Sequence, residues 1–386
     1  MKGTEISFLG ESSMQSFIAE NTESIYTTLR ELCAIPAPSH FEHARAAYCK
    51  TWLEGIGATG VYIDEAQNVI LPIGCDGSRE ITVFVAHTDT VFPDTEPMPY
   101  EDDGTLIRSP GVGDDTASLV VLLHVAKYFV ENKIIPPKGV MFVCNAGEEG
   151  LGNLKGTKQL FRDYEGRIAQ FISFDDNLDG IVDTCVGSRR FEVTVKTEGG
   201  HSFLEFGNKN ALAELSRIVC EIYEIELPRI GDSKTTYNVG SVNGGTSVNT
   251  IAQTATMLCE YRSDSEDCFA EMEARFARIF DAARARGVAL SVELIGERPC
   301  MGKVDAAKME ALCECCREII ERTANAKTRR KSSSTDCNIP LSLGIPAVCI
   351  GVYRGGGMHT REEWIEKASL PVGLDVGIQV ALALTK

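Results

Sequence analysis

Apolar runs that end in acidic or histidine residues recur along the first half of the chain. Residues 81–86 form such a run, rich in β-branched residues, and His87 and Asp89 follow it at once. A strand that is apolar along its whole length is typical of an α/β sheet whose two faces are covered by helices. In these sheets ligands bind beyond the carboxyl ends of the strands. The pattern therefore predicts a buried strand that delivers His87 and Asp89 to a binding site.

Two further predicted strands end in the same way. Strand 139–144 leads into Glu148 and Glu149, and strand 169–174 leads into Asp175. Adjacent carboxylates repel each other unless a cation or an arginine compensates them. We therefore expect these acids to meet at one edge of the sheet and to share a cation there.

A glycine-rich turn supplies another pair of acids. Residues 110–115 read PGVGDD, and a helix is predicted from 116 to 131. One aspartate, Asp114 or Asp115, is enough to cap that helix, because the helix dipole favours negative charge at its N-terminus. Two acids exceed what capping needs, so the turn is a further candidate for the site.

The pattern changes in the middle of the chain. From residue 187 the predicted order is strand, helix, two strands, helix and strand, which is the split ferredoxin-like pattern. We expect an inserted α+β domain at 187–298 and a discontinuous domain made of residues 1–186 and 299–386. After the insertion, residues 329–334 read as a basic, serine-rich loop.

Length and charge exclude several classes of protein. A chain of 386 residues with 44% hydrophobic residues is typical of a globular protein of two domains. The formal net charge of −17 argues against nucleic acid or an anionic membrane as a partner. No apolar run approaches the length of a membrane span, and the N-terminus lacks an apolar signal core. The sequence predicts a cytoplasmic protein.

The 14 cysteines fit that expectation as reduced thiols. Cys313, Cys315 and Cys316 form a cluster that could bind a soft metal or sense oxidants. The cluster lacks a second spaced pair and lies in a predicted helix, which favours incidental thiols.

The strand-end residues together suit a pair of metal ions. They comprise two imidazoles and five carboxylates: His87, His359, Asp89, Asp114, Glu148, Glu149 and Asp175. Such a ligand set predicts two divalent ions, with zinc first and cobalt or manganese as alternatives, because a single ion leaves too many anions uncompensated. Two ions that share a carboxylate and a water form a hydrolytic site. One further carboxylate must stay free to take the proton of the water.

The ordered motifs resemble the di-zinc exopeptidase and deacylase family that contains peptidase T, carboxypeptidase G and aminoacylase. In the order of that family, the chain reads HTDTV, GVGDD, NAGEEG, SFDDN, GGHS, GGTSVNT, STD and GGGMHTREE. The resemblance spans nearly the whole chain and is closest to peptidase T-like members. It implies an α/β fold with a mixed-sheet di-zinc catalytic domain. It also implies that the inserted domain is a lid and dimerisation domain, which would make the protein a homodimer.

The resemblance also implies the ligands of each ion. His87 and Asp175 would complete the first ion, and Glu149 and His359 the second. Asp114 resembles the carboxylate that bridges both ions.

The remaining residues resemble catalytic and substrate-binding positions of the family. Glu148 resembles the general base, and Asp89 the acid that supports the first histidine. His201 resembles a lid histidine that reaches the site of the partner subunit and stabilises the oxyanion. Asn249 and Arg262 match lid positions that hold carboxylate or carbonyl groups of the substrate; for Arg262 a surface ion pair is the alternative.

The leading interpretation is a metal-dependent hydrolase that cleaves amide bonds of small peptides, as an aminopeptidase or tripeptidase. Asp175 favours it, because deacylases and carboxypeptidases of the family usually have glutamate there. The alternative on the same scaffold is an N-acyl-amino-acid deacylase or a carboxypeptidase. From another class, the chain could bind peptide or metal without catalysis. An inactive relative would be expected to lose Glu148 or a ligand, and all of them are present.

Overall fold

The computed structural model describes residues 2–386, which fall into two compact units. The first unit combines the residues up to Thr184 with Lys303–Lys386, and the second is Cys185–Gly302. The predicted boundaries 187–298 fall within the second unit.

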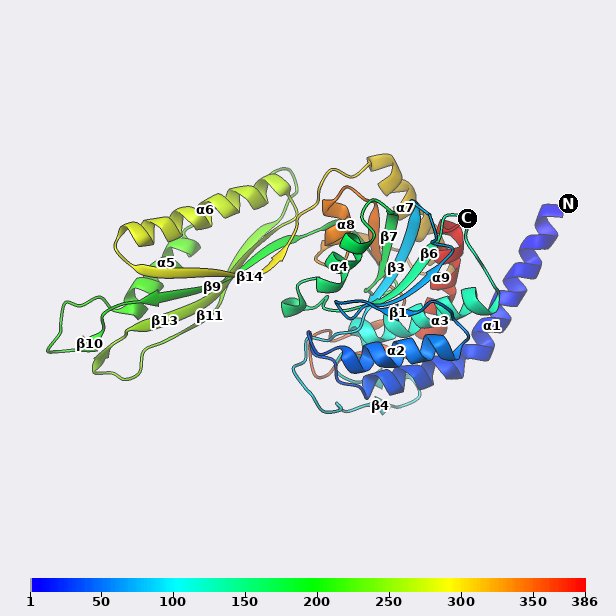
Figure 1. The fold of residues 1–386 in the computed structure, drawn as a ribbon, viewed down its shortest axis with the longest axis horizontal. Helices are drawn as coiled ribbons and strands as arrows, with labels where there is room; N and C mark the ends of the chain where they lie inside the picture. The colour runs from blue at the N-terminus through cyan, green and yellow to red at the C-terminus, as the bar shows by residue number, and fades with distance from the viewer. Residues whose placement is uncertain (1) are drawn as a thin grey trace. The chain divides into compact units, whose positions relative to one another are not determined.

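A mixed sheet of eight strands forms the centre of the first unit (Figure 1). From one edge to the other its strands are β1 (Tyr62–Ile63), β2 (Val69–Ile73), β6 (Val140–Asn145), β3 (Ile81–His87), β7 (Ile168–Phe174), β16 (Ala347–Ile350), β8 (Gly180–Cys185) and β15 (Arg329–Ser333). The central strands β6, β3, β7 and β16 run parallel, whereas β1, β2 and β8 pair antiparallel with their neighbours. The predicted α/β class with a mixed sheet is confirmed.

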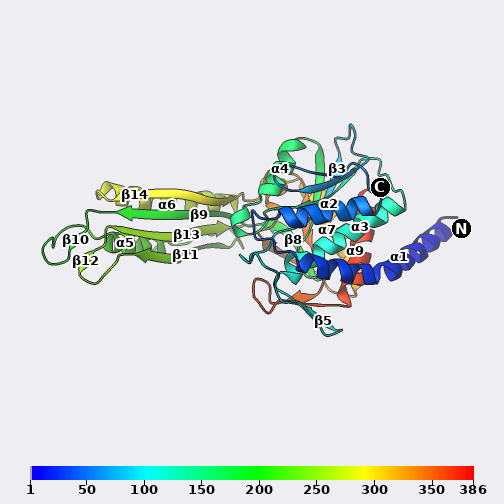
Figure 2. The same cartoon turned by 60° about the horizontal axis from the view of Figure 1, so that its bottom comes forward.

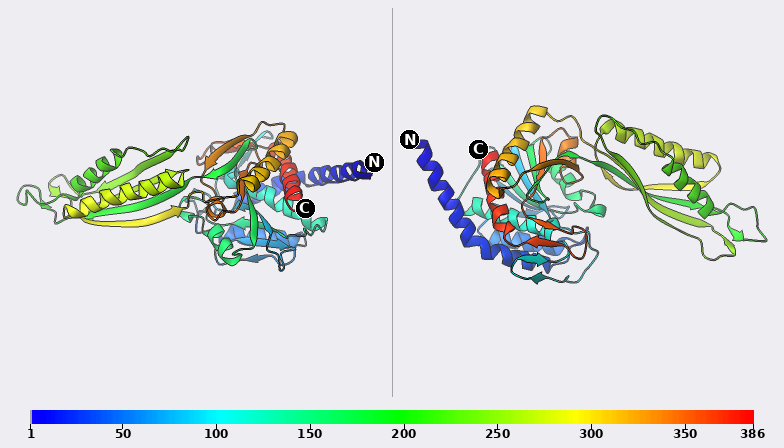
Figure 3. Two further views of the ribbon diagram at one scale, coloured as in Figure 1. Left: turned by 90° about the horizontal axis from the view of Figure 1, so that it is seen from above. Right: turned by 180° about the vertical axis from the view of Figure 1, so that it is seen from behind.

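Helices bury the centre of this sheet. Every residue of β3 and β6 is buried, and the mostly apolar helix α3 (Ser118–Glu131) packs on both strands. Around α3 lie α1 (Lys2–Cys33), α2 (His43–Gly55) and α9 (Ser369–Leu384); Figure 3 shows α1 in blue beside α9 in red. The remaining helices of this unit are α4 (Lys155–Asp163), α7 (Ala306–Ala324) and α8 (Asn338–Ser342), with two short helical segments, η1 (Val112–Ala117) and η2 (Gly150–Gly152).

A second, small sheet in the first unit joins two segments that are far apart in the sequence. Its strands are β17 (Gly355–Gly356), β18 (Trp364–Glu366), β5 (Leu106–Arg108) and β4 (Glu101–Asp102). The antiparallel pair β18–β5 brings the loop that carries His359 next to the glycine-rich turn that follows β5. No pattern in the sequence indicates that these two distant segments pair with each other.

The second unit is an antiparallel sheet of four strands with two helices. Its strands lie side by side in the order β11 (Thr235–Gly244), β13 (Thr254–Ser263), β9 (Gly187–Lys196) and β14 (Ala289–Arg298) (Figure 2). Helices α5 (Ala211–Tyr223) and α6 (Glu266–Ala285) contact each other and both contact β13, so they cover one face. This order is that of the ferredoxin-like fold. A ribbon of β10 (Gly200–His201) and β12 (Thr250–Ile251) is added to it.

Side-chain caps explain where three helices begin. Asn210 accepts backbone N–H groups at the start of α5, Ser265 does so for α6, and Asp305 for α7. These caps satisfy N–H groups that the first turn of a helix leaves without an intrahelical partner.

Across the described residues no helix is long and apolar enough to cross a bilayer. All 14 cysteines are free thiols, and Cys313 and Cys316 are buried in α7.

Candidate metal centre

The carboxyl ends of three neighbouring parallel strands carry most of the predicted site. β3 ends at His87, which lies opposite Asn145 at the end of β6. Glu148 and Glu149 follow β6, and Asp175 follows β7, which is the other neighbour of β3. Parallel strands that end in register place the residues after them at one edge of the sheet, as the sequence pattern predicted.

Asp114 lies between the two histidines that the sequence singled out. Its Oδ1 is 3.0 Å from His87 Nε2, and its Oδ2 is 3.0 Å from His359 Nε2. The same nitrogen of His359 lies 3.6 Å from Glu149 Oε2. Asp114 is 7% exposed and leaves the helical conformation within η1, where its peptide bond to Asp115 is cis. One carboxylate with an imidazole at each oxygen has the arrangement of a bridging ligand.

Two overlapping groups of ligand atoms are close enough to hold metal ions. Each group has its ligand atoms within 4.8 Å of one another: His87, Glu148 and Asp175 in one, and His87, Asp114 and Glu149 in the other. The first group contains Glu148, whose sequence motif predicted the role of a base. The geometry therefore brings all the expected ligands together but does not separate the base from them.

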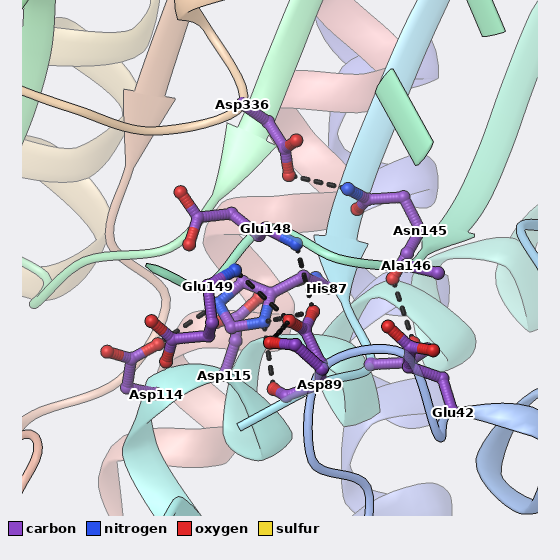
Figure 4. Close-up of polar contacts among 12 residues, drawn as sticks. Glu42, His87, Asp89, Asp114, Asp115, Asn145, Ala146, Glu148, Glu149 and Asp336 are labelled. Carbon is purple, nitrogen blue, oxygen red and sulfur yellow. Dashed lines mark hydrogen bonds and ion pairs between the residues drawn. The ribbon is translucent and has the colours of Figure 1, made fainter. Parts of the chain in front are cut away.

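Asp89 contacts both His87 and the turn that carries Glu148 and Glu149. Its backbone oxygen accepts from His87 Nδ1 over 3.0 Å, while its Oδ1 lies 3.5 Å from that nitrogen. The carboxylate accepts the backbone N–H groups of Glu148, over 3.0 Å, and of Glu149, over 3.1 Å. The Ser39 hydroxyl donates to it as well. Because a carbonyl oxygen only accepts, His87 Nδ1 carries a proton and Nε2 faces Asp114 (Figure 4).

The site holds more carboxylates than neighbouring positive charges. Burial, together with Asp114 and Glu148, raises the pKa of Glu149 to about 10. Burial and the neighbouring aspartates raise the pKa of Asp175 well above its usual value. Glu149 Oε1 is buried and has no hydrogen-bond partner among the described residues. A divalent cation offsets such repulsion and uses such an oxygen, so this donor set fits metal ions.

The same negative charges also raise the pKa values of the two histidines, which favours the charged form of each imidazole. Burial alone would lower the pKa of His87, but the carboxylates of Asp115, Asp114 and Asp89 raise it well above its usual value. Contact with Asp114 likewise raises the pKa of His359.

A buried arginine beneath the site was not predicted. Arg45, in α2, is 1% exposed and donates to the backbone oxygens of Ile35 and Thr88, over 2.9 and 3.1 Å, and to Thr116 Oγ1, over 3.2 Å. Burial lowers the pKa of its guanidinium, and the charges of Asp89 and Asp115 oppose that shift. In the sequence Arg45 is one charged residue of an amphipathic helix, and nothing distinguishes it from a surface residue.

An unpredicted carboxylate lies beside the turn that carries Glu148. Asp336, in the STD motif, accepts from Asn145 Nδ2 over 2.6 Å (Figure 4). It also accepts from the hydroxyl of Thr157. Burial and the charge of Glu148 raise the pKa of Asp336 to about 6. The STD motif was the only signal for it in the sequence.

Three predicted residues lie in the second unit. His201 is exposed in β10, and its Nδ1 accepts from the backbone N–H groups of Phe203 and Leu204. Asn249 is exposed, and its side-chain oxygen accepts from the Ser247 hydroxyl. Arg262 forms two hydrogen bonds with the Glu260 carboxylate, of 2.8 and 3.0 Å, which is the ion pair that we considered as the alternative.

The chain is similar to known proteins in sequence and in fold. The model of peptidase family M20/M25/M40 matches residues 83–383. The chain is 23% identical to the uncharacterised protein YqjE of Bacillus subtilis over 360 residues, which cover 89% of this chain and 93% of that protein. It is 22% identical to succinyl-diaminopimelate desuccinylase of Corynebacterium glutamicum over 342 residues, or 86% and 89% of the two chains. The crystal structure of aminopeptidase PepT from Bacillus cereus matches with a TM-score of 0.72 and 20% identity, over 95% of this chain and 99% of that chain.

Proposed function

The chain belongs to peptidase family M20/M25/M40, a family of amide-bond hydrolases, and from this premise we propose that it is a di-metal aminopeptidase of short peptides. The observation that carries the proposal is the position of Asp114 between His87 and His359. A carboxylate that offers one oxygen to each of two imidazole-bearing sites suits a bridge between two divalent ions.

Five residues would hold the ions. His87, Asp114 and Asp175 would hold the first, and Asp114, Glu149 and His359 the second. Imidazole and carboxylate ligands suit zinc, and cobalt or manganese would fit the same donors. When bound, two such ions supply Lewis acidity to the substrate carbonyl and to the attacking water.

Glu148 would act as the general base. It takes a proton from the attacking water and delivers it to the nitrogen of the leaving amine, so that the amide bond breaks without a charged leaving group. Two contacts support this role. Asp89 holds the backbone N–H of Glu148, which fixes the turn, and a Glu148 oxygen lies within 4.8 Å of ligand atoms of His87 and Asp175.

The second unit would act as a lid and as the dimer interface. His201 would stabilise the oxyanion that forms on the substrate in the site of the partner subunit. Its Nδ1 is occupied by backbone N–H groups, which leaves Nε2 for a substrate. Asn249 and Arg262 would contact polar groups of the substrate, with Glu260 competing for Arg262.

The direction of substrate binding separates two enzyme activities. An aminopeptidase places a free ammonium group near the metals, where the excess of carboxylates attracts it. A deacylase places an acyl group there and holds the carboxylate of the amino acid in the lid. The similarity to aminopeptidase PepT and the presence of Asp175 favour the first scheme, whereas the similarity to a desuccinylase favours the second.

Blocking the amino terminus of the substrate tests this choice. Hydrolysis of a tripeptide is compared with hydrolysis of its N-acetylated form and of N-acyl amino acids, with zinc or manganese added. The aminopeptidase proposal predicts cleavage of the free tripeptide and at least ten-fold slower cleavage once it is acetylated. Faster turnover of the acylated amino acids would replace it with the deacylase activity.

The cellular site would be the cytoplasm, where a reducing environment keeps the 14 free thiols reduced.

A further inference from the structure

One carboxylate fixes the backbone of the turn that carries Asp114. Glu363 is 1% exposed and accepts three backbone N–H groups of this turn. Its Oε2 accepts from Gly111 over 2.7 Å, and its Oε1 accepts from Gly113 over 2.9 Å and from Asp114 over 2.8 Å. The third of these donors is the peptide N–H of Asp114 itself.

Glu363 also belongs to the loop that carries His359. This loop connects β17 to β18, and β18 pairs with β5, directly before the glycine-rich turn. The backbone oxygen of Glu363 accepts from Ser109 over 3.2 Å. The loop thus binds the turn through a backbone hydrogen bond and through one buried side chain. In the same loop, His359 Nε2 lies 3.0 Å from Asp114 Oδ2.

A carboxylate suits this position better than an amide. Both oxygens of Glu363 accept, and Oε1 accepts twice, whereas glutamine offers a single acceptor oxygen and an NH2 group. With glutamine, at least one backbone N–H would face an NH2 group and lose its partner. The turn also approaches Glu363 closely, since a Cβ on Gly113 would lie 2.9 Å from Glu363 Oε1.

We propose that Glu363 is a positioning residue that sets the affinity of the second metal site by locking His359 to Asp114. The inference rests on the proposed function, in that His359 and Asp114 are taken to share an ion. Nothing comparable ties Glu363 to the other ligands of the first ion: His87 ends β3 and Asp175 follows β7, and both are placed by the large sheet.

The two metal sites should therefore respond differently to the loss of Glu363. Substitution of residues that orient metal ligands typically weakens metal binding 10- to 100-fold. The structure predicts a loss of this size for the second ion and a smaller loss for the first, which shares Asp114 but keeps His87 and Asp175 on the large sheet.

Metal titration of the full-length protein tests the inference. Metal-free wild type, Glu363→Gln and Glu363→Asp are titrated with Zn²⁺ by calorimetry, and the melting temperature of each metal-free protein is measured alongside. The aspartate keeps the charge but is one methylene too short for all three contacts, so both variants should lose the second ion selectively. Glu362→Gln is the matched control. Glu362 is the sequence neighbour of Glu363 and its side chain is exposed, so this variant should bind Zn²⁺ like wild type.

Each outcome decides a separate question. Selective weakening of the second ion in both variants, with a cooperative melting transition that shows each metal-free protein to be folded, supports the inference. Equal weakening of both ions, or unchanged binding, overturns it while leaving the proposed function intact. A wild type that binds fewer than two ions contradicts the proposed function itself. Should the glutamine variant fail to fold, the aspartate variant answers the same question.

Discussion

The Asp89 carboxylate accepts the backbone N–H of Glu148 over 3.0 Å, so the side chain of Asp89 holds the main chain of Glu148. The other oxygen of Asp89 accepts from Glu149. The expected role of Asp89 was to support His87, yet the nearer partner of that imidazole is the backbone oxygen of Asp89. Its carboxylate also lies 3.5 Å from that imidazole and, in addition, orients the turn that carries Glu148 and Glu149.

Replacing Asp89 tests this role. Asp89→Asn keeps the size of the side chain, but its NH2 group faces one of the two backbone N–H groups, so the Glu148–Glu149 turn should shift. We expect kcat to fall about 10- to 100-fold. Ser39→Ala, which removes only a donor to the same carboxylate, is the control and should have a clearly smaller effect. Steady-state kinetics measures both, and equal effects would contradict the assignment.

Arg45 should be essential for stability rather than for chemistry. Arg45→Met would leave the backbone oxygens of Ile35 and Thr88 without a donor and would remove the positive charge beside Asp89 and Asp115. Removing one partner from such a buried network costs about 3–5 kcal/mol. Urea unfolding of the metal-free protein measures this loss. A loss below about 1 kcal/mol would show that water or the remaining groups compensate.

The strand-end residues were predictable, whereas the buried Arg45 beneath them was not. His87, Glu148, Glu149 and Asp175 stand out because an apolar strand ends abruptly in polar residues, and the strands are parallel neighbours. Arg45 does not stand out, because a charged residue in an amphipathic helix looks the same whether it faces water or a buried site.

Short strands were also missed, for a physical reason. The strands β17 and β18 have two and three residues, too few to show a period of two. The basic segment predicted as a loop at 329–334 is largely the edge strand β15, whose Arg330 pairs with Asp183 of β8. An exposed edge strand carries charged and polar residues, so its pattern resembles that of a loop.

The pH dependence of stability should reveal the buried imidazole of His124. Burial lowers its pKa to about 4, and it donates from Nδ1 to the oxygen of Val120. Below pH 6.5 the unfolded chain binds a proton that the folded state excludes, so the free energy of unfolding falls as the pH drops from 6.5 towards 4. Between pH 7 and 4.5 this histidine accounts for about 2 kcal/mol of the fall.

Comparison with a variant isolates that contribution. His124→Gln cannot titrate, so its loss of stability between pH 7 and 4.5 should be smaller than that of wild type by about 2 kcal/mol. His43→Gln, an exposed histidine, is the control and should behave like wild type. Urea unfolding at the two pH values measures the difference, and identical slopes in His124→Gln and wild type would contradict it.

Subunit mixing tests whether His201 acts on the partner. His201→Ala chains and Glu148→Gln chains should each be inactive alone. If the lid serves the neighbouring site, mixed dimers contain one site with both intact residues, and part of the activity returns. No recovery after verified subunit exchange would mean that His201 acts within its own chain or not at all.

The central claim is a di-metal site in which Glu148 is the base and not a ligand, and metal analysis of Glu148→Gln combined with its kcat tests it most directly. We predict two divalent ions per chain, as in wild type, and a kcat reduced about 10³-fold, because only the proton acceptor is lost. Loss of an ion from the variant would make Glu148 a ligand, and a near-normal kcat with both ions present would show that another group is the base.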